Sequence, residues 1–137
     1  MHRIIYFSSA THFFNLEELD SLLLKSRMKN AANGITGLLI YIDGDFIQIL
    51  EGEKEKVQNL FNLIKLDKKH STVISVFDQQ VPGRMFENWA MGFSQQTIQS
   101  LRKNNSFSTL NLDELKESKG NNVTIFLETF IKSHRIV

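Results

Sequence analysis

Three side chains with strong hydrogen-bonding groups are the candidates for binding chemistry in this sequence: the phenol of Tyr6 and the carboxamides of Asn30 and Gln48. Gln48 is the most unusual, because it lies on a predicted strand with Phe46 and Leu50 as its neighbours on the same face. A buried carboxamide without a partner costs about 1–3 kcal/mol, so a polar group must meet it there. That group is either a backbone atom or water, or else the polar edge of a ligand, and spacing alone does not decide between them.

The elements that position these side chains follow from hydrophobic periodicity and from turn signals. Asn15 and Glu18 form a capping box that starts a helix, which is expected to end near Asn30. The dipeptide Asp43-Gly44 favours a tight hairpin turn that needs positive φ at both positions. Strands are predicted over residues 3–9, 35–42, 46–50, 72–81 and, after a short turn, within 84–94, and helices over residues 16–30 and 54–66.

This order of elements, βαββαββ, is typical of an α+β fold of the ferredoxin-like kind. We expect a five-stranded mixed sheet with two helices on one face, and with the first and third strands side by side at its centre. The composition changes after Ser94, so residues 1–95 are expected to form one domain and residues 96–137 a C-terminal helical extension.

The C-terminal extension contains a short helical piece at residues 112–117 and a stronger helix at residues 121–133. The apolar stripe of the stronger helix consists of Val123, Phe126, Leu127, Phe130 and Ile131. The face of the sheet opposite the first two helices needs a cover. We therefore expect these C-terminal helices to pack on or near that face, or to dimerise across it.

Side chains from several elements should converge on the space between the two helices and the sheet. Alternation along the strands and helical spacing assign to it Tyr6, Phe46, Gln48 and Leu50, then Leu22, Ser26, Lys29 and Asn30, and finally Leu63, Ile64 and Asp67. The aliphatic members form two walls that suit a flat aromatic ring. The amides at one end can satisfy a ring edge that carries both donors and acceptors.

Composition argues against several classes of function. The chain has 137 residues, a net charge of +1 and no cysteine, so nothing favours nucleic acid or an anionic membrane, and thiol chemistry is excluded. The four histidines are scattered without metal-ligand spacing, so no metal is expected. No signal peptide is recognisable, and the longest apolar run is far shorter than the roughly 20 residues of a membrane-spanning helix. We expect a cytoplasmic protein.

Four motifs stand in a recognisable order and spacing: Tyr6 on the first strand, Asn30 with the following ANGITGLL, FIQILEG around Gln48, and the run with Arg84, Phe86, Trp89 and Met91. Together they resemble the BLUF domain, a blue-light sensor that uses flavin. The resemblance covers about two thirds of the chain, residues 1–95, and its specificity comes from the combination of all four motifs. In size the chain is similar to the short, PixD-like members, which have a helical tail and no enzyme domain.

The resemblance implies a flavin, FAD above all, that lies between the two helices with its ring pointing into the domain. Asn30 would bond the pyrimidine edge near N3 and O4, and Lys29 would stand on the O2 side. Leu22 and Ile64 would sandwich the ring. The ribityl chain and the phosphate would pass near two further residues, Asp67 and His70.

The resemblance also implies a photochemical role for Tyr6 and Gln48, with Gln48 between the phenol and the N5/O4 edge. A phenol with a reference pKa of about 10 keeps its proton at neutral pH, yet it can give up an electron to a photoexcited flavin. A carboxamide has a donor end and an acceptor end, so rotation or tautomerisation reverses what it offers. We therefore expect light to drive electron and proton transfer from Tyr6, then rearrangement of Gln48 and a small red shift.

The signal should then leave the flavin site by protein contacts. Trp89 and Met91 are the expected relays, and the C-terminal helices are the expected readers. No catalytic output domain is visible, so the output is expected to be an unidentified protein partner or a change of homo-oligomer.

One departure from the family pattern concerns the flavin tail. Many family members carry an arginine on the second helix where this chain has Leu63. FMN or riboflavin are therefore alternatives to FAD. The alternatives to a photosensor are a cofactor-free ferredoxin-like interaction module and a small acylphosphatase-type enzyme. The enzyme would need a phosphate-binding loop with arginine after the first strand, and residues 8–14 contain neither glycine nor arginine.

Overall fold

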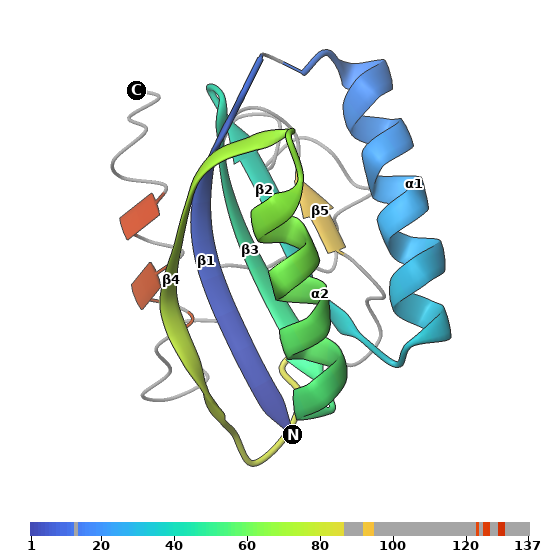
Figure 1. The fold of residues 1–137 in the computed structure, drawn as a ribbon, viewed down its shortest axis with the longest axis vertical. Helices are drawn as coiled ribbons and strands as arrows, with labels where there is room; N and C mark the ends of the chain where they lie inside the picture. The colour runs from blue at the N-terminus through green and yellow to red at the C-terminus, as the bar shows by residue number, and fades with distance from the viewer. Residues whose placement is uncertain (13, 87–91, 95–122, 124, 127–128, 131–137) are drawn as a thin grey trace.

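The computed structural model describes residues 1–12, 14–86, 92–94, 123, 125–126 and 129–130. In this part of the chain a five-stranded sheet carries two helices on one of its faces (Figure 1), which confirms the α+β, ferredoxin-like prediction. The elements in chain order are β1 (His2–Ala10), α1 (Leu16–Ala32), β2 (Thr36–Ile42), β3 (Asp45–Gly52), α2 (Lys54–Leu66), β4 (His70–Gln80) and β5 (Gly92–Ser94).

The strands lie in the order β4-β1-β3-β2-β5, so the first and third strands are side by side as predicted. Neighbouring strands run antiparallel, except that β2 and β5 are parallel and make the sheet mixed. The register places Tyr6 of β1 and Leu39 of β2 on either side of Gln48 in β3. Because strands pair with Gln48 on both sides, its position in the sheet is fixed.

The last predicted strand, within residues 84–94 after a short turn, has a described counterpart at its C-terminal end. β5 consists of Gly92–Ser94 and pairs with Leu38, Leu39 and Ile40 of β2. Residues 84–86 form no strand, and the amides of Met85 and Phe86 donate to the Glu51 carboxylate. The expected relays Trp89 and Met91, the boundary near residue 95 and the helical piece at 112–117 lie outside the described residues.

Helix α1 begins as the sequence predicts and ends slightly later. The amide of Glu18 donates to Asn15 Oδ1 at 2.8 Å, and the amide of Asn15 donates to Glu18 Oε1 at 3.2 Å, which completes the capping box. The helix continues past Asn30 to Ala32, so the end predicted near Asn30 is two residues early. The helix stops where Gly34 takes a φ of +66°, a conformation that glycine adopts without steric cost.

The hairpin between β2 and β3 has the predicted turn. Asp43 has a φ of 49° and Gly44 a φ of 88°, so both central positions are in the left-handed region. A two-residue turn of this kind matches the twist of the strands that it joins. It therefore sets the alternation along β3, with Phe46, Gln48 and Leu50 toward the helices.

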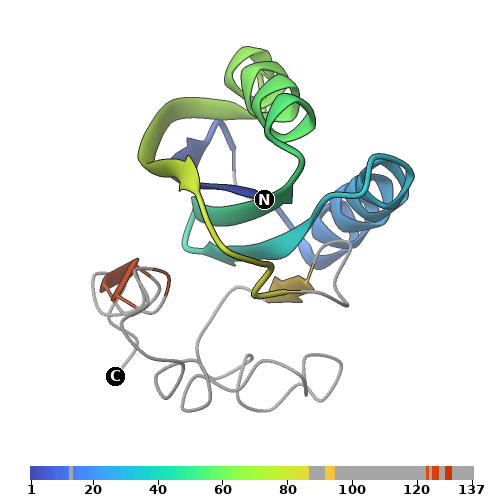
Figure 2. The ribbon, with the colours of Figure 1, turned by 90° about the horizontal axis from the view of Figure 1, so that it is seen from below.

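Two apolar cores lie on opposite sides of the sheet. The helix-face core contains Ile4, Tyr6, Phe14, Leu19, Leu23, Ile35, Leu39, Tyr41, Phe46, Leu50, Val57 and Phe61. The far-face core contains Ile5, Leu38, Ile40, Ile42, Ile47, Ile49, Phe86, Val123 and Phe130. Figure 2 shows the red C-terminal residues on the side of the sheet opposite α1 and α2.

The described residues of the C-terminal extension lie on the far face, as predicted for its helices. Val123 and Phe130 are buried there, and Phe126 packs against the same core. The ring of Phe130 stacks on Phe7 of β1 with 5.8 Å between the ring centroids. Leu127 and Ile131, the other two members of the predicted stripe, lie outside the described residues.

Candidate functional site

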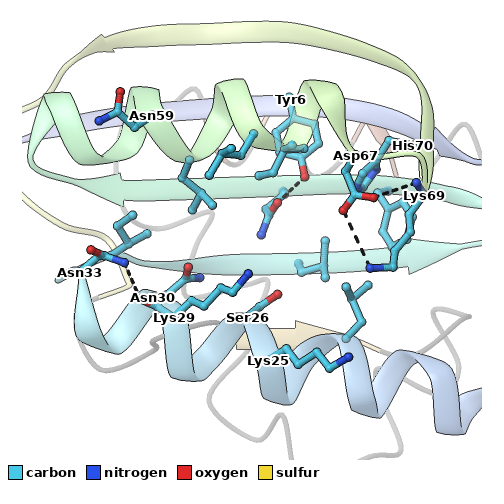
Figure 3. A pocket seen from close by; sticks show the side chains of 18 of the residues that line it. Tyr6, Lys25, Ser26, Lys29, Asn30, Asn33, Asn59, Asp67, Lys69 and His70 are labelled. Atoms are coloured by element: carbon cyan, nitrogen blue, oxygen red, sulfur yellow. Dashed lines mark hydrogen bonds and ion pairs between the residues drawn. The ribbon is translucent and has the colours of Figure 1, made fainter.

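A cavity of about 390 Å³ lies between α1, α2 and the sheet, where the sequence predicts the binding site (Figure 3). Of the residues predicted for the site, those that line the cavity are Tyr6, Leu22, Ser26, Lys29, Asn30, Phe46, Gln48, Leu63, Ile64, Asp67 and His70. Leu50, which was also predicted, is fully buried in the helix-face core and is not part of the lining. The cavity therefore lies around Gln48 and does not reach the position of Leu50.

Several lining residues are absent from the sequence prediction. They are Lys25, Asn33, Ile35, Leu39, Lys56, Asn59, Leu60 and Lys69. Helical spacing could have found the first two, because Lys25 lies four residues before Lys29 and Asn33 lies four residues after it. Leu39 lies opposite Gln48 in the β2–β3 register, which the hairpin turn fixes. Lys69 follows α2 in a loop and has no periodic signal.

Tyr6 and Gln48 form the central hydrogen bond of the site. The Tyr6 hydroxyl donates to Gln48 Oε1, and the two side chains are only 1% and 5% exposed. Burial raises the pKa of Tyr6 above its ordinary value of 10.0, and the negative charge of Asp67 raises it further. The phenol therefore keeps its proton and stays a hydrogen-bond donor throughout the physiological range of pH.

Asn30 brings a second buried carboxamide to the cavity from α1. Its side chain is 3% exposed, and its backbone carbonyl accepts from the amides of Asn33 and Ile35 at 3.1 and 2.9 Å. These backbone bonds end the helix and hold Asn30 beside the sheet. Two carboxamides and a phenol thus line one cavity from different elements, which suits a ligand edge with both donors and acceptors.

His70 stands at the start of β4 beside the phenol. Its Nδ1 lies 2.8 Å from Ser8 Oγ, and its ring meets the Tyr6 ring nearly edge-on, with 6.2 Å between centroids. A second contact, with 5.1 Å between centroids, joins it to Phe46. Burial lowers the pKa of His70 from its ordinary value of 6.5, although the nearby Asp67 opposes this in part.

This lowered pKa predicts a loss of stability in acid. In the unfolded chain His70 takes up a proton as the pH falls below 6.5, whereas in the folded chain it resists protonation to a lower pH. Its contribution to stability is therefore complete above pH 6.5 and declines as the pH falls through the folded pKa. Between about pH 7 and about pH 5, the midpoint temperature of thermal unfolding should fall further in the wild type than in His70→Gln. Equal losses in the two proteins would contradict this.

The charge around the cavity is mainly positive. Lys25, Lys29, Lys56 and Lys69 line it, whereas Asp67 is the acidic residue of the lining. Lys69 Nζ lies 4.0 Å from Asp67 Oδ2, which partly neutralises that pair, and Figure 3 shows the two side chains together at one end. The remaining lysines can attract an anionic group, because the potential of like charges adds in a concave site.

The lining is consistent with the flavin that the resemblance implies. Leu22 and Ile64 are partly buried on the facing helices, and both pack against the helix-face core. Gln48 and Asn30 are buried polar residues that line the same cavity, so both carboxamides are available to a ligand there. Apolar walls with a few polar groups are the usual composition of a site for a flat aromatic cofactor.

Two further observations concern other kinds of site. The described residues contain no group of three or more histidine, cysteine, aspartate or glutamate side chains that could hold a metal ion. Among the described helices, none has the length and apolar character needed to cross a membrane.

Comparison with known proteins matches residues 1–92 to a family model, BLUF, described as sensors of blue-light using FAD. One curated relative is the photoactivated adenylate cyclase subunit alpha of Euglena gracilis, with 35% identity over 83 residues, which is 61% of this chain and 8% of that protein. A beta subunit from Euglena longa has 32% identity over 83 residues and 10% of its length matched. The chain thus spans about a tenth or less of these relatives.

Several solved structures are similar to this chain. The photo-activated state of BlsA has a TM-score of 0.68 and 28% identity, and the match covers 99% of this chain and 95% of that one. BlrP1 of Klebsiella pneumoniae, solved with FMN and cyclic diGMP, has a TM-score of 0.75 and 26% identity, covering 96% of this chain and 34% of that one. A bacterial light-regulated adenylyl cyclase has a TM-score of 0.67 and 32% identity, with 98% and 34% covered.

Proposed function

The chain belongs to the BLUF family of blue-light sensors, and from this premise we propose that its Tyr6–Gln48 hydrogen bond is the element that light rearranges. The observation that carries this proposal is the buried bond from the Tyr6 hydroxyl to Gln48 Oε1 at the wall of the cavity. A flavin bound in the cavity would supply the absorption of blue light and, once excited, an acceptor for one electron.

Tyr6 would provide the electron and then the proton. In the dark its hydroxyl holds the proton, because burial keeps its pKa high. A phenol that has lost an electron is a strong acid, so its proton would move along the bond that already leads to Gln48 Oε1. The carboxamide would then present a donor where it had presented an acceptor, through rotation or tautomerisation. The electron and a proton would return to Tyr6 afterwards, so that the net change is the rearranged hydrogen bond and no group is oxidised or reduced. Asn30 would hold the other polar edge of the ring system in place.

We propose FAD as the bound flavin, with FMN and riboflavin as alternatives. The resemblance assigns an arginine to the position of Leu63, and here this side chain is 66% exposed at the cavity. The lysines of the lining, of which Lys25 and Lys56 are examples, supply positive charge that a flavin phosphate would need. FMN is present in the structure of the related BlrP1, which keeps this smaller form as an alternative.

The experiment that tests the proposal is a light-minus-dark absorption spectrum of the purified, flavin-loaded protein. Blue light should shift the flavin band to longer wavelength, and the shift should reverse in the dark. Gln48→Leu should bind flavin and lose the shift, because leucine cannot exchange donor for acceptor. Chromatography of the flavin released by denaturation identifies the bound form.

A matched control is Gln79→Leu, which makes the same change at an exposed position of β4. It should keep the full, reversible shift. A Gln48→Leu protein whose shift equals that of Gln79→Leu would remove Gln48 from the mechanism.

We further propose that residues 1–137 pass the signal on by contact with another protein or with a second copy of the chain. In the relatives from Euglena the matched region is a small part of an adenylate cyclase. Trp89 and Met91 remain the proposed relays from the site to the C-terminal helices. Size-exclusion chromatography in light and in darkness would test a change of association.

A further inference from the structure

A buried carboxylate at the end of β3 joins this strand to the far face of the sheet. Glu51 is 0% exposed and lies three residues beyond Gln48, so its side chain points to the opposite face. Arg3 of β1 holds one of its oxygens, with Nε and one terminal nitrogen at 2.8 and 2.7 Å from Glu51 Oε2. The strand that carries Gln48 therefore ends in an ion pair with the strand that carries Tyr6.

The same carboxylate binds the chain segment that follows β4. The amide of Met85 donates to Glu51 Oε1 at 2.8 Å, and the amide of Phe86 donates to the same oxygen at 2.9 Å. The neighbouring Arg84 donates to the Glu51 carbonyl oxygen at 3.1 Å and to Thr36 Oγ1 at 2.8 Å. Residues 84–86, called the anchor segment below, are thereby fastened to β3 and β2.

The anchor segment leads directly into the far-face core. Phe86 is buried there with Val123 and Phe130 of the C-terminal extension. Hydrogen bonds to an ionised carboxylate are stronger than neutral ones, and breaking a buried pair is costly. Any displacement of the end of β3 must therefore move Phe86 with it or break these bonds.

We propose that Glu51 is a positioning residue that couples strand β3 to the C-terminal residues of the far-face core, so that the light-induced change at Gln48 reaches them through this carboxylate. The coupling rests on the function proposed above. Packed elements shift between discrete arrangements and do not deform continuously, so a small change in β3 is passed on by the groups fastened to it. The hydrogen bonds from the Met85 and Phe86 amides to Glu51 are the contacts that transmit the shift of β3.

The test is amide hydrogen exchange of the flavin-loaded protein, in darkness and under blue light, with the absorption spectrum recorded on the same samples. In the wild type, light should change the exchange rates of the Met85 and Phe86 amides by about threefold or more. In Glu51→Gln, these amides should exchange about tenfold faster in the dark, because a neutral amide oxygen is a weaker acceptor. In the wild type, light should also change the exchange of the Phe126 and Phe130 amides. In Glu51→Gln this light-induced difference should be lost, whereas the red shift should remain.

The matched control is Glu53→Gln, which also removes one negative charge. Glu53 lies two residues after Glu51, and its side chain is exposed and makes no capping hydrogen bond. It should behave as the wild type does. A Glu51→Gln protein that keeps the light-induced difference at Phe130 would overturn the coupling. If Glu51→Gln does not fold, the wild type decides alone: a red shift without any change at Met85 and Phe86 overturns the coupling, whereas a missing red shift overturns the proposed function itself.

Discussion

Tyr6→Phe is expected to abolish the light-induced red shift and to leave the protein yellow. Phenylalanine keeps the ring that packs against Phe61, with 5.4 Å between centroids, and against His70. It removes the hydroxyl, and with it the bond to Gln48 Oε1 and the proton that the mechanism moves. The loss of one buried hydrogen bond costs about 1–3 kcal/mol, which a folded domain tolerates. Difference spectra after blue light provide the measurement.

Tyr41 offers the control within the same chain, which has two tyrosines. Its ring is equally buried, and its hydroxyl accepts from the Phe14 amide at 3.1 Å, but it does not line the cavity. Tyr41→Phe should therefore keep the red shift. A full and reversible shift in Tyr6→Phe would refute the assignment of Tyr6, and its loss in both variants would show that the loss is not specific to Tyr6.

Among the substitutions considered for their effect on stability, Gly37→Ala is expected to lower the free energy of unfolding most. A Cβ at this position of β2 would lie 1.8 Å from the carbonyl oxygen of Ile49 and 2.8 Å from its carbonyl carbon. These are backbone atoms of β3, which is paired on both sides, so they cannot move aside as a side chain would. We expect a loss of about 3 kcal/mol or more in the free energy of unfolding. Urea unfolding measures it.

Gly83→Ala is the control for this substitution. A Cβ there would meet nothing within 4 Å, so the free energy of unfolding should change by about 0.5 kcal/mol or less. Equal midpoints for Gly37→Ala and Gly83→Ala would mean that β2 and β3 can separate at this point.

The sequence predicted those parts of the fold whose signals are local. The Asp43-Gly44 turn requires positive φ at neighbouring positions, and the capping box needs only the spacing of Asn15 and Glu18. Once the turn is fixed, the period of two along a strand decides which side Gln48 faces. The cavity residues on β1 and β3, and those on α1 apart from Lys25, follow from these local rules.

The features that the sequence did not predict depend on contacts between distant segments. Glu51 binds Arg3 and Met85, which are 48 and 34 residues away, and no periodic pattern marks such partners. Alternation assigned Leu50 correctly to the helix face, but it cannot give the depth at which the cavity ends. Lys69 lines the cavity from a loop, where side-chain direction follows from tertiary packing.

The cross-strand alignment of Tyr6 with Gln48 has a consequence for how this sensor can change by insertion or deletion. One extra residue within β1 ahead of Tyr6 would turn the phenol to the opposite side of the sheet. Insertions in surface loops would leave the pair intact. Grafting the pair onto another antiparallel sheet would require more than the two amino acids. They would have to be placed at directly paired positions of two central strands, and a cavity would have to lie over that face of the sheet.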